Sequence, residues 1–213
     1  MGVKVGPKVV KDGLIFAIDA AVSRSYSGSG QTTYGLIDDY RGTLLNGVGF
    51  TSANNGSFVF DGTNDYITFD YDIMGSTYTQ NIWFKLNVLQ PSLLIDQGWS
   101  AAVVHSNYVA FYYTNVSPVF FSASFTFTTD RWYMINLVRG ADVKTVYIDG
   151  NFIASSNTSD AFDPFWTTMY VGSNVGSIQF LNGNISQIQI YNRTLSAQEI
   201  LQNYNATKRR YGL

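Results

Sequence analysis

The sequence offers few side chains for acid–base or nucleophilic chemistry. It holds a single histidine, His105, a single glutamate, Glu199, and no cysteine. A catalytic serine needs a neighbouring base, and His105 is the sole histidine that could act as one. His105 lies between two expected strands, where a surface-turn histidine is common. No Gly-x-Ser-x-Gly elbow, phosphate-binding loop or group of His and Cys metal ligands occurs.

Paired carboxylates are the other parts from which a hydrolytic site is built. The candidates are Asp38 with Asp39, in an expected loop, and Asp70 with Asp72, at the end of an expected strand, where solvated turn aspartates are common. Glu199 stands three residues after Ser196, a spacing typical of a helix-capping box, so its presence needs no catalytic explanation. We therefore expect that the protein is not an enzyme.

Aromatic rings outside the expected core could instead stack on the apolar faces of sugar rings, with amide groups nearby to bind the hydroxyls. The densest such region is 97–113, and a second group surrounds Pro164. The predicted ligand-binding residues are Trp99, Asn107, Tyr108, Tyr112 and Trp166. The alternative for Trp99 and Trp166 is packing of their loops onto the core, because a strand-rich chain must bury most of its aromatic rings.

The segment Asp61-Gly62-Thr63-Asn64-Asp65 places oxygen-bearing side chains at alternate positions, as Ca²⁺-binding loops do. It lacks the glycine at the sixth position of an EF-hand. The alternative is that Asp61 and Asp65 close a turn by accepting hydrogen bonds from backbone N–H groups. We predict no cofactor, with Ca²⁺ at Asp61 and Asp65 as the alternative.

Composition limits the class of protein. The chain has 213 residues, 13% of them charged and 16% aromatic, and a net charge of −2, so no overall field favours nucleic acid. No apolar run is long enough to span a bilayer, and the N-terminal segment has no apolar stretch typical of a secretory signal. The absence of cysteine excludes disulfides.

Short stretches with β-type alternation, separated by turns, predict an all-β sandwich. The clearest is the hairpin 57–69, in which apolar and polar residues alternate on both sides of Asp61-Gly62. The predicted core residues are Phe58, Phe60, Ile67, Phe69, Trp83, Trp132 and Ile188. One helix is expected at 196–205, where Ser196 and Glu199 fit a capping box and Leu195 and Ile200 a hydrophobic staple.

Three segments carry a family resemblance: Ser57–Phe69 (SFVFDGTNDYITF), Gly183–Ile200 (GNISQIQIYNRTLSAQEI) and, more weakly, Gly13–Ala20 (GLIFAIDA). They resemble the laminin G-like, concanavalin A-like lectin/glucanase superfamily. The resemblance implies an all-β fold, a two-sheet antiparallel jelly-roll sandwich (concanavalin A-like) with one short C-terminal helix. It also implies an N-terminal arm over 1–12, a sandwich over 13–207 and a basic tail over 208–213.

The resemblance bears on chemistry as well. Catalytic members of the family carry two glutamates with an aspartate between them on one strand, which this chain lacks. Many members hold Ca²⁺ at a sandwich edge and carry Asp-Glu in the last strand, where this chain has Ser186-Gln187.

The two ends of the chain, MGVKVGPKVVKDGL and YNATKRRYGL, resemble those of short stand-alone laminin G-like proteins of tailed bacteriophages. We therefore expect a virion structural protein, a head-decoration, fibre or appendage protein, that assembles with other virion proteins or with itself and binds host-surface glycans. No nucleic-acid or membrane partner is expected. The alternative is a cellular carbohydrate-binding module or adhesin fragment.

Basic residues are concentrated at both ends, while the rest of the chain has seven Lys or Arg and all fifteen acidic residues. We expect the ends to lie on one side and to anchor the protein to an acidic partner or a second copy, with the alternative of two solvated tails. The predicted assembly residues are Lys4, Lys8, Lys11, Lys208, Arg209 and Arg210.

Overall fold

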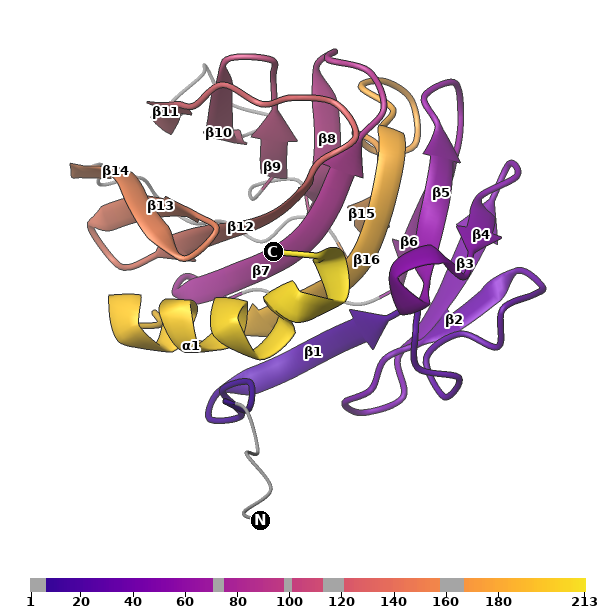
Figure 1. Cartoon of the computed structure of the whole chain (residues 1–213), viewed down its shortest axis with the longest axis horizontal. Coiled ribbons are helices and arrows are strands. Elements are labelled where there is room, and N and C mark those ends of the chain that lie inside the picture. Colours follow the sequence, from indigo (N-terminus) through magenta and orange to yellow (C-terminus); the bar gives the residue numbers. More distant parts are fainter. Residues whose placement is uncertain (1–6, 71–74, 98–100, 113–120, 158–166) are drawn as a thin grey trace.

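The structure is a computed structural model that describes residues 7–70, 75–97, 101–112, 121–157 and 167–213. Within these residues the chain forms two antiparallel eight-stranded sheets, with one α-helix on the outer side of one sheet (Figure 1). The prediction of an all-β jelly-roll sandwich with one short C-terminal helix is confirmed.

Sheet A has the strand order β14-β13-β12-β7-β16-β5-β4, and β1 pairs with the second half of β16. Because β1 lies beside β16, the first and last strands of the chain are neighbours. The strands are β1 (Leu14–Asp19), β4 (Gly49–Thr51), β5 (Ser57–Asp61), β7 (Tyr78–Leu86), β12 (Trp132–Arg139), β13 (Val143–Ile148), β14 (Asn151–Asn157) and β16 (Asn182–Tyr191).

Sheet B has the order β11-β10-β9-β8-β15-β6-β3-β2. Its strands are β2 (Thr32–Tyr34), β3 (Arg41–Leu45), β6 (Tyr66–Phe69), β8 (Ser92–Asp96), β9 (Ala101–Val104), β10 (Tyr108–Tyr112), β11 (Phe121–Ser124) and β15 (Met169–Val171). The predicted hairpin at 57–69 is split between the sheets, since β5 belongs to sheet A and β6 to sheet B.

Side chains from the two facing sheets fill the interior, because successive strand residues point to opposite faces. In β7, Ile82, Phe84 and Leu86 point inward and are fully buried. The predicted core residues on the inner faces are all buried: Phe58, Phe60, Ile67, Phe69 and Ile188.

A second apolar cluster lies on the outer face of sheet A, under helix α1 (Ala197–Thr207). Trp83 and Trp132 are buried as predicted, but they belong to this outer cluster rather than to the interior. The predicted cap of α1 is confirmed: Ser196 Oγ accepts from the Glu199 N–H, and the Glu199 carboxylate accepts from the Ser196 N–H.

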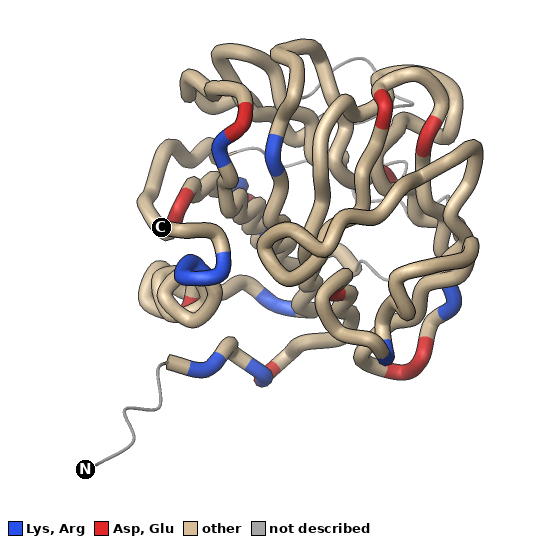
Figure 2. Tube along the Cα trace, turned by 45° about the vertical axis from the view of Figure 1, so that its right-hand side comes forward, with Lys and Arg blue, Asp and Glu red and all other residues tan. Residues whose placement is uncertain are grey.

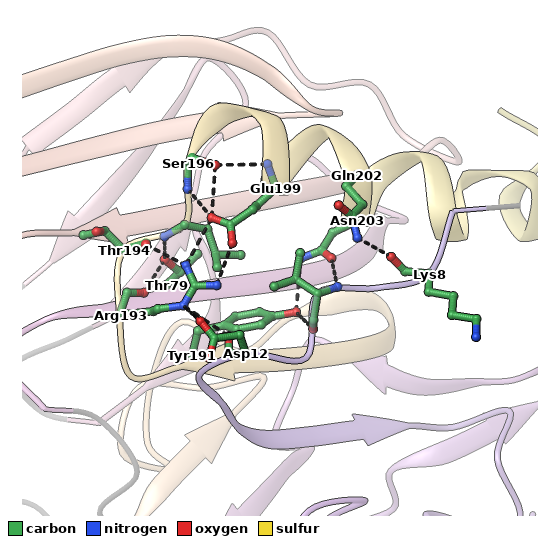
Figure 3. A network of polar contacts seen from close by, with 12 residues as sticks. Lys8, Asp12, Thr79, Tyr191, Arg193, Thr194, Ser196, Glu199, Gln202 and Asn203 are labelled. Atoms are coloured by element: carbon green, nitrogen blue, oxygen red, sulfur yellow. Dashed lines mark hydrogen bonds and ion pairs between the residues drawn. The ribbon is translucent and has the colours of Figure 1, made fainter.

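The described part of the N-terminal arm, residues 7–12, lies along α1 (Figure 3). The backbone N–H of Val10 donates to Asn203 Oδ1 at 2.8 Å, and the carbonyl of Val10 accepts from the Tyr191 hydroxyl at 3.0 Å. Gln202 Nε2 donates to the carbonyl of Lys8 at 2.7 Å. Since Val10 is also 7% exposed, these residues are docked on the domain and do not form a free tail.

The C-terminal segment is docked as well, which is contrary to the alternative of two solvated tails. Lys208–Tyr211 form a 3₁₀ helix, η2, and the ring of Tyr211 stacks on Trp83 with 4.0 Å between centroids. The Arg210 guanidinium pairs with Asp19 at 2.7 Å and donates to the Ser186 hydroxyl at 2.6 Å. Each contact comes from a residue far away in sequence, which explains why the charge run alone suggested solvation.

Candidate functional site

One row of outward-facing residues crosses the outer face of sheet B. Strand register joins them in pairs: Thr32 to Thr43, Thr43 to Thr68, Thr68 to Tyr170, Tyr170 to Asp96, and Asp96 to Ala101. Tyr112 is the next register position, opposite Ala101 in β10. Thr32, Thr43, Thr68 and Tyr170 are all half-buried, so this part of the row, which we call the threonine–tyrosine row, is accessible from outside.

Two tyrosines stand side by side on this face. Tyr66 lies two residues before Thr68 in β6, and its ring centroid is 6.0 Å from that of Tyr170, at an interplanar angle of 42°. Both rings are half-buried. Burial raises the pKa of Tyr170, and the nearby Tyr66, Asp96 and Asp70 raise it further. Tyr170 therefore keeps its hydroxyl proton at neutral pH and can donate a hydrogen bond.

The loop 173–179 lies beside the tyrosine pair. A Cβ placed on Gly176, which has φ +68°, would come within 2.9 Å of the Tyr66 ring, so the loop backbone touches that ring directly. Val175 has φ +42°, a strained conformation for a β-branched residue. Its N–H donates to Asp96 Oδ2 at 3.3 Å. Strain of this kind clusters at ligand-binding sites, which adds weight to this location.

The other half of the face is closed. Leu93, Ala101 and Val103 point outward from β8 and β9, yet each is at most 2% exposed. Asp96, at the boundary, is also fully buried. On the β15 side of Asp96, the accessible part of sheet B is the part formed by β2, β3, β6 and β15, and on the far side Ser122 and Ser124 of β11 are exposed as well.

The predicted ligand-binding residues have mixed outcomes. Trp99 and Trp166 lie outside the described residues, and the side chain of Tyr112 is not described. Asn107 is exposed and Tyr108 half-buried at the β9–β10 turn, where Tyr108 stacks on His105 with 4.0 Å between centroids. Burial lowers the pKa of His105. The structure therefore brings Tyr108 and Asn107 together, but at a distance from Tyr66 and Tyr170, across the closed half of the face.

The sequence reasoning missed Tyr66 and Tyr170, although the signal was present. The alternation Tyr66-Ile67-Thr68-Phe69 puts Tyr66 and Thr68 on the side opposite two core residues. Tyr170 is likewise flanked by the buried Met169 and Val171. Both tyrosines could have been read as outward-facing. That the two tyrosines lie side by side could not be predicted from the sequence, because it depends on β15 pairing with β6.

The candidate carboxylate pairs are only partly described. Asp38 and Asp39 both have positive φ in an exposed loop, and Asp39 forms an exposed ion pair with Arg24 at 3.6 Å. Asp70 is exposed at the end of β6, near Tyr170, and Asp72 lies outside the described residues.

Asp61 and Asp65 close the turn between β5 and β6. Asp61 Oδ1 accepts from the N–H of Thr63 at 2.7 Å and of Asn64 at 3.4 Å, and these bonds lower the pKa of Asp61. Asp65 Oδ2 accepts from the Asp61 N–H at 3.1 Å, while burial raises the pKa of Asp65. Its buried Oδ1 has no hydrogen-bond partner, so one oxygen fits a cation.

That oxygen does not by itself make a metal site. Among the described residues, no three His, Cys, Asp or Glu side chains gather at one place. The absence of a cofactor stays a prediction, with Ca²⁺ at Asp61 and Asp65 as the alternative.

A cavity of about 230 Å³ lies on the opposite side of the sandwich. Polar groups on its wall are already bonded: Gln187 donates to Asp19, and Thr207 Oγ1 accepts from Trp83 Nε1. The rest of the lining is largely apolar, which does not suit a sugar. Its lining residues are Val9, Leu14, Ala17, Ile18, Asp19, Leu36, Ile37, Gln187, Gln189 and Thr207.

The sandwich and the accessible outer face of sheet B define a jelly-roll domain of the lectin type. The sequence profile described as "Concanavalin A-like lectin/glucanases superfamily" matches residues 61–201, and the chain belongs to this family. No curated protein matches the sequence significantly. None of the described helices has the length and apolar character needed to cross a bilayer.

Solved structures with this fold include toxin and enzyme domains. The receptor-binding domain of botulinum neurotoxin type G has a TM-score of 0.67 and 16% identity, over 91% of this chain and 51% of that one. A second structure is titled "Cell entry of botulinum neurotoxin type C is dependent upon interaction with two ganglioside molecules". It has a TM-score of 0.70 and 13% identity, over 92% of this chain and 51% of that one.

The Trypanosoma rangeli sialidase in complex with sialic acid has a TM-score of 0.71 and 13% identity, over 97% of this chain and 36% of that one. The chain thus spans about half the length of the toxin domains. At these identities the likeness concerns the fold.

Proposed function

We propose that this chain is a glycan-binding domain without hydrolytic activity, and that it binds sugars on the accessible outer face of sheet B. The observation that carries the proposal is the half-buried, outward-facing pair Tyr66 and Tyr170 beside a row of threonine hydroxyls. Resemblance to receptor-binding domains of toxins, one of them linked to gangliosides, supports it.

The chemistry of this face suits a sugar. A pyranose has apolar C–H faces, which pack against aromatic rings, and a rim of hydroxyls, which need hydrogen-bond partners. Tyr66 and Tyr170 supply the rings. Thr43 and Thr68 supply hydroxyls that both donate and accept, so they can bind sugar hydroxyls in either sense.

A glycan array followed by titration of the best ligand tests the proposal. Tyr170→Ala should weaken binding at least tenfold while leaving the circular dichroism spectrum unchanged. Phe152→Ala is the matched control, because Phe152 is an aromatic residue 59% exposed on sheet A, and it should bind as the wild type does. Equal loss in both variants, or no loss in either, would contradict the assignment of the site.

Absence of hydrolysis is a separate part of the proposal. It rests on the small inventory of acid–base groups, with one His and one Glu in the sequence. Among the described residues, Asp70 and Asp96 are the acidic groups that raise the pKa of Tyr170, and they are the candidates to test. Release of reducing sugar from laminarin-, agarose- or alginate-type polysaccharides, abolished in Asp70→Asn or Asp96→Asn, would show that the domain is a glycosidase.

We further propose that the domain is displayed on the virion of a tailed bacteriophage. The resemblance of the two chain ends to those of short phage proteins supports this setting, and a cellular carbohydrate-binding module or adhesin fragment is the alternative. Mass spectrometry of purified particles tests it directly. Capsid and tail genes beside the coding sequence favour the virion, whereas a long secreted reading frame favours the alternative.

Assembly through the basic ends also remains a proposal, with a smaller set of residues. Basic residues gather around the two ends of the chain (Figure 2). Lys8, Lys11 and Arg209 are exposed and available to an acidic partner or a second copy. Arg210 is excluded, because its side chain is 11% exposed and paired with Asp19. Lys4 lies outside the described residues.

Lys208, the remaining member of the set, is half-buried, with its Nζ 5.0 Å from the centre of the Tyr204 ring. Charge reversal at Lys8, Lys11 and Arg209 should therefore reduce incorporation into particles or oligomers without unfolding the domain. Unchanged incorporation of this triple variant would exclude anchoring through the ends.

A further inference from the structure

A second row of outward-facing residues lies beside the threonine–tyrosine row on sheet B. Strand register sets Tyr34 of β2 opposite Arg41 of β3. The pairing of Gly42 with Phe69 then sets Arg41 opposite Asp70, the residue after β6. All three side chains are exposed, that of Tyr34 at 43%. We call Tyr34, Arg41 and Asp70 the second row.

The second row faces outward because the residues next to it in sequence face the core. Thr33 and Phe69 are fully buried. A Cβ placed on Gly42 would come within 2.5 Å of the Phe69 ring, so Gly42 also faces the interior. Because successive strand residues point to opposite faces, the second row lies on the same face as the threonine–tyrosine row, two residues away along each strand.

Arg41 and Asp70 carry opposite charges on neighbouring strands, so the second row has no net charge. The Cβ atoms of residues directly opposite each other in an antiparallel pair are about 4.5–5.5 Å apart. Neither side chain forms a hydrogen bond or an ion pair with another residue that the structure describes. The guanidinium can therefore donate, and the carboxylate accept, hydrogen bonds that are about twice as strong as those between neutral groups. Adjacent hydroxyls of a sugar can make both kinds of bond.

Tyr34 adds an aromatic ring at the edge of the sheet. Its backbone is held in place, because its N–H donates to the carbonyl of Ser25 at 2.7 Å and its carbonyl accepts from Ser25 Oγ at 2.8 Å. Its ring is exposed and contacts no aromatic ring among the described residues. An exposed tyrosine on a fixed backbone offers a surface on which a sugar ring can stack at a small cost in conformational entropy.

Tyr34 is too far from the tyrosine pair to contact the same sugar unit. It lies three strands from Tyr170 and two residues away along the strand direction. With strands about 4.8 Å apart and a rise of about 3.3 Å per residue, the two Cα atoms are about 16 Å apart. The separation from Tyr66, two strands and four residues away, is also about 16 Å. The hydroxyls of Thr43 and Thr68 lie between these rings.

We infer that the outer face of sheet B carries two sugar subsites, one at the tyrosine pair and one formed by Tyr34 and Arg41, and that its ligand is a linear oligosaccharide long enough to occupy both. The inference rests on the proposed function, because it specifies how much of a glycan the same face binds. One ligand that reaches two sites binds more tightly than a ligand that reaches either site alone. A short glycan held by the tyrosine pair does not obtain this gain.

The test measures affinity as a function of chain length by isothermal titration calorimetry, with each probe free in solution. Because the second row has no net charge, neutral linear oligosaccharides are suitable probes. Four series are used, each from the disaccharide to the hexasaccharide: cello-, laminari-, malto- and N-acetylchito-oligosaccharides. We expect at least one series to bind, with the hexasaccharide bound at least tenfold more tightly than the disaccharide.

Tyr34→Ala and Arg41→Gln are the informative variants, because both residues are exposed and lie away from the tyrosine pair. Each should reduce the gain from disaccharide to hexasaccharide at least threefold and leave the affinity for the disaccharide unchanged. Tyr34→Phe keeps the ring and should keep the gain. Phe152→Ala and Arg209→Gln remove an exposed ring and an exposed guanidinium elsewhere, and both should bind every probe as the wild type does.

The outcomes separate the inference from the function on which it rests. Equal affinity for all chain lengths, or a gain that survives in Tyr34→Ala or in Arg41→Gln, would overturn the second subsite and keep the first if Tyr170→Ala still abolishes binding. A loss in Tyr34→Ala that is equal for the disaccharide and the hexasaccharide would also overturn it, because the two subsites would not be separate.

Two results reach further. If none of the four series binds, the inference is wrong, and the glycan array decides on the proposed function independently. Binding of the hexasaccharide that survives Tyr170→Ala would overturn the proposed site and the inference together.

Discussion

Truncation of one aromatic ring, two residues before the C-terminal residue of the sequence, should destabilise the whole domain. Tyr211 is 6% exposed, and its ring centroid lies 4.0 Å from that of Trp83 and 4.9 Å from that of Trp132. Replacing a buried large aromatic side chain by alanine typically costs about 3–5 kcal/mol. In a domain of this size each kcal/mol lowers Tm by about 2–4 °C, so Tyr211→Ala should lower Tm by roughly 6–20 °C.

Thermal and urea unfolding of the purified protein, followed by tryptophan fluorescence, measure the effect. Tyr211→Phe keeps the stacked ring and should melt within a few degrees of the wild type. Leu213→Ala, a truncation at a residue 37% exposed, is the matched control for a change near the end of the chain. If Tyr211→Ala melts together with Leu213→Ala and the wild type, then the C-terminal segment is not part of the folded core and our description of η2 is wrong.

Three further predictions concern the helix cap and the β5–β6 turn. Hydrogen bonding to Arg193 lowers the pKa of Glu199 to about 2, so the stability that the ionised Glu199 contributes is present above its ordinary pKa of 4.5 and is lost as the pH falls towards 2. Because Glu199 is the single glutamate, carbon-13 NMR of glutamate-labelled protein gives one resonance. Arg193→Ala should move the titration midpoint of that resonance to higher pH. Ser196→Ala should cost about 1 kcal/mol in urea unfolding and leave glycan binding unchanged, whereas a selective loss of binding would contradict a purely structural cap. Millimolar Ca²⁺ should leave Tm unchanged, because Asp61 Oδ1 already accepts hydrogen bonds from two backbone N–H groups; a rise in Tm that disappears in Asp61→Asn would demonstrate a metal site.

Sequence patterns were sufficient for the fold because the relevant signals are local. Alternation in the segment 57–69 placed Phe58, Phe60, Ile67 and Phe69 inward, and each is at most 1% exposed. The predicted pairing of the two strands as a hairpin was wrong, because β5 and β6 belong to different sheets. The capping box of α1 is also local, since its two partners are three residues apart. These features need no knowledge of distant parts of the chain.

Local patterns did not predict on which face of sheet A the tryptophans lie. Trp83 and Trp132 were correctly expected to be buried, but β7 and β12 are buried on both faces, so alternation could not say which face met the interior and which met α1. The docked Arg210 is a similar case, because its partners come from β1, η1 (Ala53–Asn55) and β16.

The candidate site was predicted only in its chemistry. The sequence analysis predicted ligand-binding residues in a stretch dense in aromatic residues, Trp99 to Tyr112. Tyr66 and Tyr170 are isolated in sequence and come together through strand pairing. The sugar-binding chemistry of tyrosine and threonine follows from residue type. The location of the site depends on tertiary structure.

The position of β16 near the centre of sheet A determines how the chain can fold during synthesis. β16 pairs with β1, β5 and β7, so that sheet A remains in separate pieces until residues 182–191 have been made. Until then the edges of those three strands that face β16 have no native partner, and unpaired strand edges are where chains associate wrongly. Folding of sheet A must therefore wait until β16 has left the ribosome, and fragments that stop before β16 should be recovered mainly as aggregates.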